Sequence, residues 1–207
     1  MQAGSTSKGC LLLGKRTIER NKKAKQILVI EPIHKDIVNG CKKGNRKAQE
    51  QLYRNYYRAM ATLCMRYTRN EEDAVEVLNN GFLKVFRNIE KYDEKQAVLY
   101  TWMRTIIINS CLDFIRQKEK TISHMELDEA VEIDIPAEAI SRMKATELLH
   151  LVRQLPPATQ AVFNLYVMDG YNHKEIAQML SIKEGTSKWH LSEARKSLQQ
   201  KIRLQEV

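Results

Sequence analysis

The side chains best placed for chemistry lie near the C-terminus, on a helix that the sequence predicts to begin at Ser181. An α-helix turns by about 100° per residue. Leu191, Ala194 and Leu198 therefore fall on one narrow side, which favours a buried stripe. The opposite side carries a set of larger polar and aromatic residues, namely Trp189, Ser192, Glu193 and Lys196.

This polar face combines groups that read duplex nucleic acid. An indole such as that of Trp189 contacts thymine methyl groups, and a carboxylate such as that of Glu193 accepts a hydrogen bond from a cytosine amino group. Lys188 would pair with a phosphate or with guanine. Two other interpretations stay open: Trp189 packs against a neighbouring helix, or the whole face is an ordinary solvated surface.

Catalytic and metal-binding arrangements are not found in the sequence. Glu71, Glu72 and Asp73 are adjacent, so on a helix they point in different directions and form a solvated first turn rather than a metal cluster. The four cysteines form no C-x-x-C pair, and the five histidines are scattered, so no zinc spacing can be assembled. We predict a protein that is not an enzyme and that holds no metal or other cofactor.

The polar face needs a rigid support, and the sequence predicts a helix-turn-helix. A short helix over 173–180 places Ile176 and Ala177 on one side. Ser181 and Glu184 match a Ser-x-x-Glu capping box, which predicts that Ser181 is the N-cap of the second helix. Two helices joined by such a turn in a basic chain are typical of a DNA-binding unit.

The rest of the C-terminal part, over 141–207, is also predicted to be helical, so that it forms a four-helix domain. Pro156 and Pro157 separate its first two helices, and Gly170 ends the second. Between Thr121 and Ile140 the chain has six carboxylates and no Lys or Arg. Residues 119–140 are therefore predicted to be an acidic linker.

The N-terminal part is predicted to be a second helical domain, over 36–118. Asn70 is the expected N-cap of a helix that ends near Asn88, and a third helix covers about 100–117. The first of the three helices should bury one stripe, listed as Leu52, Tyr56, Ala59 and Leu63. The second should turn four residues inward, listed as Val75, Leu78, Phe82 and Val85. Residues 1–35 are expected to be a poorly ordered basic extension.

Composition agrees with an all-α protein of two small helical domains. The 207 residues include only 8 Gly and 4 Pro, and alternating apolar runs are few. The formal net charge of +9 favours a polyanionic partner, with nucleic acid ahead of an anionic membrane surface. No apolar run approaches the ~20 residues that a membrane-spanning helix needs, so we expect a cytoplasmic protein with no membrane insertion and no small-molecule substrate.

Two stretches of the chain together resemble the extracytoplasmic-function (ECF) sigma factors of the sigma-70 family. The stretch "LPPATQAVFNLYVMDGYNHKEIAQMLSIKEGTSKWHLSEARKSL" is similar to the C-terminal domain of that family. "NEEDAVEVLNNGFLKVFRNIEKYD" and "YTWMRTIIINSCLDFIRQ" are similar to its N-terminal domain. The similarity covers roughly 36–118 and 141–202, in the family's order and spacing.

The resemblance implies partners and site residues. Sigma factors bind core RNA polymerase, through the clamp helices of its largest subunit and the flap of the second largest, and direct it to promoter DNA. The implied readers of the −35 element are Lys188, Trp189, Ser192, Glu193 and Lys196. The implied contacts to the melted −10 strand are Asn109, Asp113, Trp102, Arg116 and Lys118. The implied polymerase contacts are Asn79, Asn80, Phe82, Lys84 and Arg87.

Some of these residues also have plainer interpretations. Trp102 is a candidate core residue, and a solvated helix end explains Arg116 and Lys118 almost as well as a phosphate contact does. Asn79 and Asn80 replace the glutamine and carboxylate that are commoner in the family. The family commonly has an anti-sigma factor, which we expect as a further partner.

Several recognition-helix residues also depart from the family's usual pattern. Ser187 replaces an apolar residue, and Trp189, His190 and Glu193 replace smaller or basic residues. These last changes should alter which promoter is read.

Two other classes of protein would require features of their own in the sequence. A helix-turn-helix regulator would bind operator DNA without polymerase and would need a dimer seam, which the sequence does not show. A DNA-processing enzyme such as a serine recombinase would need an activated nucleophile or clustered carboxylates. A sigma factor is the interpretation that the two domains in register favour.

Overall fold

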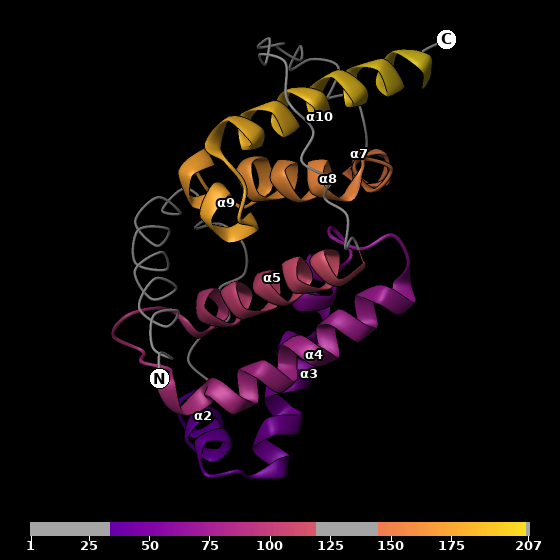
Figure 1. The fold of residues 1–207 in the computed structure, drawn as a ribbon. Helices are drawn as coiled ribbons and strands as arrows, with labels where there is room; N and C mark the ends of the chain where they lie inside the picture. The colour runs from indigo at the N-terminus through magenta and orange to yellow at the C-terminus, as the bar shows by residue number, and fades with distance from the viewer. Residues whose placement is uncertain (1–33, 119–144, 206–207) are drawn as a thin grey trace. The chain divides into compact units, whose positions relative to one another are not determined.

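The computed structural model describes residues 34–118 and 145–205, and every regular element in those ranges is helical (Figure 1). The first range contains α2 (His34–Lys42), α3 (Arg46–Cys64), α4 (Glu71–Asn88), the short 3₁₀ turn η2 (Ile89–Lys91) and α5 (Leu99–Lys118). The second range contains α7 (Ala145–Arg153), α8 (Pro157–Phe163), the π-helical turn η3 (Asn164–Met168), α9 (His173–Leu180) and α10 (Glu184–Gln205). The all-α prediction is confirmed, whereas the basic extension and the acidic linker lie almost wholly outside the described residues.

The described residues divide into two compact units. One contains residues 34–64 and 74–110. The other contains residues 65–73, 111–118 and 145–205. α5 thus contributes to both units, since the division falls after Ser110.

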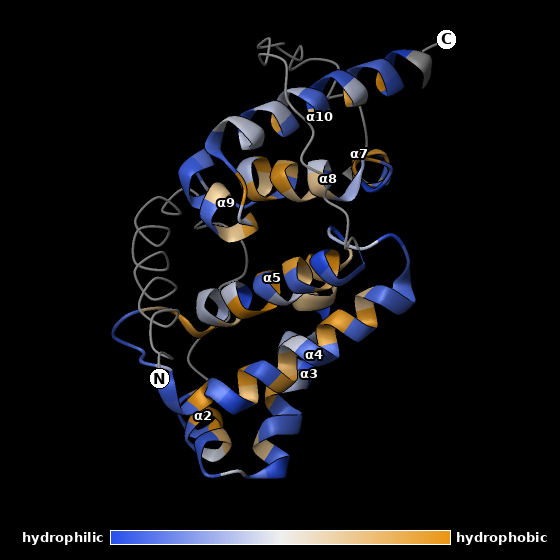
Figure 2. Cartoon of the chain, viewed as in Figure 1, coloured by the Kyte–Doolittle hydropathy of each residue, from blue (hydrophilic) through white to orange (hydrophobic). Residues whose placement is uncertain are grey.

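The core of the first unit is built from one apolar stripe on each long helix. Figure 2 shows these stripes as orange bands that interrupt the blue of α3 and α4. Burying each large side chain contributes about 1.5–3 kcal/mol relative to leaving it exposed. The fully buried members are Leu52, Met60, Leu78, Phe82, Met103, Ile107 and Ile108.

The predicted stripes are partly correct. Leu52, Tyr56 and Leu63 are buried on α3, but Met60 takes the position expected of Ala59, which is only half-buried. On α4 Val75 is 39% exposed, contrary to the prediction, and Val77 is buried in its stead. The reason is that the buried arc of α4 is centred on a different line than predicted, so that Val75 lies just beyond its edge; the arc consists of Ala74, Val77, Leu78, Gly81, Phe82 and Val85.

The N-cap of α4 is confirmed. The side-chain oxygen Oδ1 of Asn70 accepts a hydrogen bond from the backbone N–H of Asp73 at 2.8 Å. The acidic first turn of α4 also places negative charge at the positive end of the helix dipole. The start of α4 is therefore specified by local sequence.

Gly81 sets how closely α4 approaches α5. A Cβ atom added at Gly81 would lie 2.4 Å from Cδ1 of Ile107, a side chain that is fully buried. Cβ atoms do not come so close to another carbon without a shift, and Ile107 has no free space into which to move. The glycine is thus required by packing rather than by its backbone angles.

We predict that Gly81→Ala destabilises the protein by about 1–3 kcal/mol, the usual cost of overpacking a core. Gly185→Ala is the matched control because nothing lies within 4 Å of the added Cβ. That change should be neutral or add up to about 1 kcal/mol of stability through helix propensity. Urea unfolding followed by circular dichroism measures both. Equal stability of the two variants would contradict the packing argument.

The C-terminal helices are separated at the prolines and the glycine that the sequence predicted. Pro157 occupies the first turn of α8, where a missing N–H costs nothing, and Pro156 precedes it as the N-cap. Gly170 has a φ of +75°, the left-handed conformation that ends a helical segment. α10 packs against α7, α8 and α9, and its buried stripe consists of Leu191, Ala194, Leu198 and Ile202.

Candidate nucleic-acid interface

The turn between α9 and α10 differs from the predicted capping box. Ser181 has a φ of 57° and a ψ of 40°, so it is the left-handed C-cap of α9 rather than the N-cap of α10. α10 begins at Glu184, with the N–H of Ser187 bonded to the carbonyl of Lys183 at 3.1 Å. The predicted helix start was wrong because the turn needs a residue of positive φ directly after α9, and Ser181 supplies it.

A capping box does occur, but at the start of α9. The side chain of Asn172 accepts a hydrogen bond from the N–H of Glu175 at 2.9 Å, and the Glu175 carboxylate accepts one from the N–H of Asn172 at 2.9 Å. The sequence signal was present, since Asn is a strong N-cap and Glu follows three residues later. The first helix of the pair is therefore anchored at its beginning, and a left-handed residue fixes the turn at its end.

α10 has the two-sided character that the sequence predicts. Leu191, Ala194 and Leu198 are at most 4% exposed, whereas Lys188 and Lys196 are exposed and Trp189 and Glu193 are partly exposed. Lys188 forms a 3.1 Å ion pair with Glu184 one turn earlier on the same helix. Both partners are well exposed, so this pair contributes little stability and can exchange for a phosphate.

Ser192 differs from its neighbours on this face. It is buried, with only 8% of its surface exposed, although it lies on the same side of α10 as Trp189 and Lys196. A base-edge contact by Ser192 would need the side chain to be uncovered. The accessible part of the polar face therefore consists of Lys188, Trp189, Glu193 and Lys196.

Two histidine–hydroxyl contacts join α10 to the helices beneath it. Nδ1 of His173, on α9, lies 2.9 Å from Oγ of Ser187, and Nδ1 of His190, on α10, lies 3.0 Å from Oγ1 of Thr159 on α8. Ser187 is fully buried, so its hydroxyl needs a partner inside the protein. The contact with His173 supplies that partner.

The pKa of each histidine lies below its ordinary value. Burial is the cause for His190. For His173 burial acts first and the nearby Lys188 and Arg195 lower the pKa further, while Glu184 opposes them. The folded protein thus favours the neutral imidazoles, whereas the unfolded chain protonates near pH 6.5. Stability should consequently fall as the pH drops below about 6.5.

We predict that His190→Gln makes the unfolding midpoint less sensitive to acid. The unfolded wild-type chain binds a proton at His190 that the folded chain resists, and glutamine removes that difference. Urea midpoints at several pH values measure the effect. An unchanged slope in the His190 variant would contradict the burial argument.

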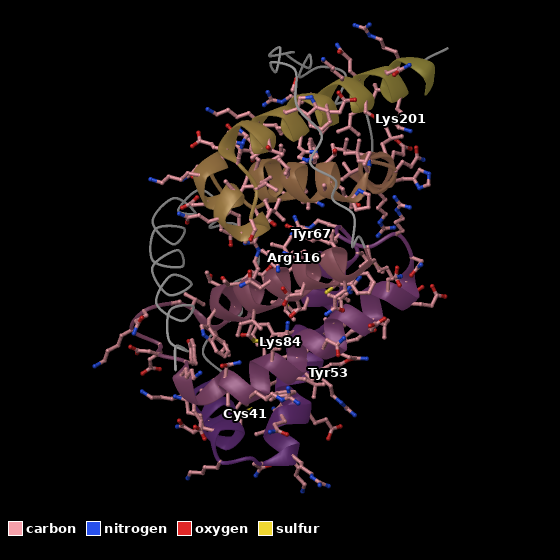
Figure 3. All side chains as sticks on the ribbon, in the orientation of Figure 1. Cys41, Tyr53, Tyr67, Lys84, Arg116 and Lys201 are labelled. Carbon is pink, nitrogen blue, oxygen red and sulfur yellow. The ribbon has the colours of Figure 1, made fainter. Side chains whose placement is uncertain are left out.

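The exposed face of α4 carries most of the predicted polymerase contacts. Asn79, Asn80 and Arg87 are exposed, and Lys84, labelled in Figure 3, is half-buried. Phe82 is buried in the core, so it does not offer a surface contact, and the prediction for this side chain is corrected. An aromatic residue in a helix that must pack on both α3 and α5 is more readily a core residue.

Three residues that were not predicted from the sequence extend this face. The hydroxyl of Tyr53 donates to Oδ1 of Asn79 at 3.1 Å, and its ring lies 4.6 Å from that of Phe82 and 5.4 Å from that of Tyr57. Leu83 is 53% exposed and Tyr57 is 40% exposed. The signal in the sequence was apolar residues outside the buried stripe. Together Tyr53, Tyr57, Asn79 and Leu83 form an apolar and amide surface on α3 and α4.

The predicted single-strand residues lie along α5. Asn109 and Asp113 are one turn apart and partly exposed, and Asp113 pairs with Arg116 at 2.8 Å. Lys118 pairs with Asp73 at 2.6 Å, and its ammonium also lies 4.8 Å from the ring of Phe114. The two basic residues are thus held by neighbours.

Trp102, at the other end of α5, is partly exposed, and its ring centroid lies 5.3 Å from that of Tyr92. That distance is an ordinary aromatic contact. It connects α5 with the segment that precedes it.

A hollow of about 610 Å³ lies beside Tyr92 and was not foreseen from the sequence. Its volume is in the range of small-molecule sites. Asp93 fixes the loop by accepting hydrogen bonds from the N–H of Lys95 at 3.0 Å and the amide of Gln96 at 2.9 Å. Lys42 donates to the carbonyl of Tyr92 at 3.0 Å. The hollow is lined by Lys35, Val38, Asn39, Lys42, Tyr92, Asp93, Glu94, Lys95 and Leu99.

Neither a metal cluster nor a spanning helix occurs in the part of the chain that the structure describes. Across 34–118 and 145–205 no three His, Cys, Asp or Glu side chains are grouped to hold a metal ion. The helices in these ranges are also too short or too polar to span a membrane.

Comparison with known proteins identifies the family. Residues 52–121 match the family described as Sigma-70 region 2, and residues 145–198 match Sigma-70, region 4. Together these matches cover more than half of the chain, and the chain belongs to the sigma-70 family. Within that family it is a sigma factor of the ECF group, a transcription initiation factor and not an enzyme.

The chain is similar to several proteins that are named as ECF sigma factors. The ECF sigma factor SigM of Mycobacterium tuberculosis is 28% identical over 75% of this chain and 77% of its own length. The ECF sigma-E factor of Haemophilus influenzae is 23% identical over 80% of this chain and 93% of its own. SigW of Bacillus subtilis is 24% identical over 84% and 99%. Among solved structures, CnrH in complex with the cytosolic domain of CnrY aligns with a TM-score of 0.44 at 16% identity, covering 81% of this chain and 96% of that chain.

Proposed function

We propose that this sigma factor binds core RNA polymerase and reads its promoter at two places, in two physical forms of DNA. α10 reads the −35 element as duplex in the major groove, and α5 with the segment that precedes it captures the −10 element as a melted strand. The observation that carries the proposal is the two-sided α10. Its apolar stripe is buried, while Lys188, Trp189, Glu193 and Lys196 remain accessible.

The −35 contact follows from groove chemistry. A major groove about 12 Å wide admits one α-helix and presents a distinct donor and acceptor pattern for each base pair. Lys188 and Lys196 supply charge for phosphates, and Trp189 and Glu193 supply the side chains that discriminate bases. The phosphate contacts make binding salt-dependent, and the base contacts determine which sequence is bound.

The −10 contact needs different properties, because an unstacked base must be received in a recess and held by its edges. Asn109 offers both a donor and an acceptor. We propose that the hollow beside Tyr92, which neither Asn109 nor Trp102 lines, receives an unstacked base of the same strand, with the Tyr92 ring as its stacking surface. Arg116 and Lys118 would exchange their present carboxylate partners for phosphates.

We propose that the polymerase contact is the surface of Asn79, Asn80, Lys84 and Arg87, extended by Tyr53, Tyr57 and Leu83. An exposed leucine surrounded by amides and one arginine is typical of an interface centre with a polar rim. The clamp helices and the flap, as well as an anti-sigma factor, stay predictions that rest on the family.

We predict that Trp189→Ala and Glu193→Gln change the −35 sequences from which this protein initiates, without abolishing initiation. Each loses about 1–3 kcal/mol of discrimination at one base pair, the usual contribution of a base contact. Transcription with purified core polymerase on a pool of upstream sequences measures the preference.

A matched variant separates DNA reading from polymerase binding. Leu83→Glu places a charge on the proposed polymerase surface and should weaken association with core polymerase, whereas Trp189→Ala should retain it. If the wild-type chain binds duplex DNA but neither associates with core polymerase nor supports initiation, the proposal is wrong and the helix-turn-helix acts as an ordinary regulator.

We predict that Asn109→Ala and Tyr92→Ala impair promoter opening while leaving duplex −35 binding unchanged. Each removes a contact that only the extruded base can make, with stacking contributing about 1–3 kcal/mol per base. Reactivity of unpaired −10 thymines toward permanganate measures opening, and duplex affinity measures −35 binding. Normal opening in both variants would exclude this capture site.

A further inference from the structure

A buried threonine beneath α10 connects the protein core with the proposed −35 reader Trp189. Thr159 lies on α8, is 2% exposed, and places Oγ1 3.0 Å from Nδ1 of His190. Because burial lowers the pKa of His190, its ring is neutral at pH 7 and carries one N–H and one lone pair. The contact fixes the ring in one orientation.

His190 in turn contacts the indole of its neighbour. The two ring centroids lie 4.9 Å apart with an interplanar angle of 72°, an edge-to-face arrangement. Edge-to-face contacts are preferred over face-to-face stacking of two aromatic rings, so this one favours one rotamer of the indole. Trp189 is only partly exposed, so one edge of the indole rests on the protein while the other faces outward.

The direction of the outward edge determines which base-pair atoms the indole can reach. A side chain in the groove discriminates bases only when it is held within a fraction of an ångström of a fixed position. α10 itself fixes the Cα of Trp189 and excludes some rotamers of its side chain, but it leaves more than one open. The Thr159–His190 contact supplies the missing restraint from outside the helix.

We propose that Thr159 and His190 are positioning residues that orient the Trp189 indole and thereby set −35 selectivity. The inference rests on the proposed reading role of Trp189 and extends it to two residues that do not themselves contact the DNA bases. Thr159 lies on α8, a different helix from the one that carries the proposed reading face.

The second histidine–hydroxyl pair supplies a matched control. The hydroxyl of Ser187 also contacts a histidine, His173, and Ser187 is also fully buried. The aromatic partner of His173 is Tyr166 on η3, at 4.6 Å, and not Trp189. Removing the Ser187 hydroxyl therefore perturbs the same helix to a similar extent without acting on the indole.

The first experiment measures the motion of the indole. In a Trp102→Phe background Trp189 is the sole tryptophan of the chain, and its time-resolved anisotropy reports wobble on the picosecond-to-nanosecond scale. Thr159→Val, which keeps shape and removes the hydroxyl, and His190→Gln should each lose the restricted component. Thr159→Ser should retain it, and Ser187→Ala should leave it unchanged.

The second experiment measures selectivity, with Trp102 restored and core polymerase present. Thr159→Val and His190→Gln should lose discrimination at the base pair read by Trp189 by about tenfold, within the range for one mismatched pair. Thr159→Ser and Ser187→Ala should select as the wild type does. Circular dichroism melting shows whether each variant is folded.

Other outcomes distinguish the positioning role of Thr159 and His190 from the reading role of Trp189. If Trp189→Ala loses selectivity but Thr159→Val and His190→Gln keep both selectivity and a restricted indole, the positioning role is overturned and the reading role stands. If Trp189→Ala selects as the wild type does, the reading role fails and the selectivity part of the inference fails with it. A general loss of selectivity that includes Ser187→Ala would indicate only a weakened helix support.

Discussion

The burial of one narrow stripe of α10 is the constraint on which the DNA-binding half of this molecule depends. Leu191, Ala194 and Leu198 are covered by the helices beneath, and their burial fixes how the helix is rotated about its axis. Once that rotation is fixed, the residues on the opposite side of α10 necessarily face outward. The reading face therefore derives its position from apolar packing in which its own residues take almost no part.

Polar contacts refine what the apolar stripe establishes. Hydrophobic burial has no direction, so it tolerates a few degrees of helix rotation at little cost. The two histidine–hydroxyl contacts have defined lengths and join α10 to α8 and to α9. In the N-terminal helices a corresponding restraint comes from Gly81, whose missing side chain lets α4 approach Ile107. Both devices set geometry more than they add stability.

The sequence predicted features that depend on local or periodic signals. The Asn70 cap, the Pro156–Pro157 break and the Gly170 stop each rest on one residue type with a strong backbone preference, and all three were found. The inward stripe of α10 followed from spacing alone. The family resemblance added the roles of residues that no pattern could assign.

The failures have a common physical cause, which is that tertiary context decided between two locally acceptable states. Ser181 can cap the start of a helix or take a left-handed turn, and the connection from α9 required the turn. Val75 and Val77 are equally apolar, yet only Val77 faces the core. The Thr159–His190 contact joins residues 31 positions apart and has no sequence signature.

The separation between buried stripe and outward face also affects how such a factor can change its targets. Lys188, Trp189, Glu193 and Lys196 contribute little to the core, so under the proposed function replacements there change the promoter at small risk to folding. His190 is different, because it touches both the core and the face. Under the same proposal, a lineage that altered this residue would have to adjust its fold and its regulon together, and position 190 would slow the divergence of promoter choice.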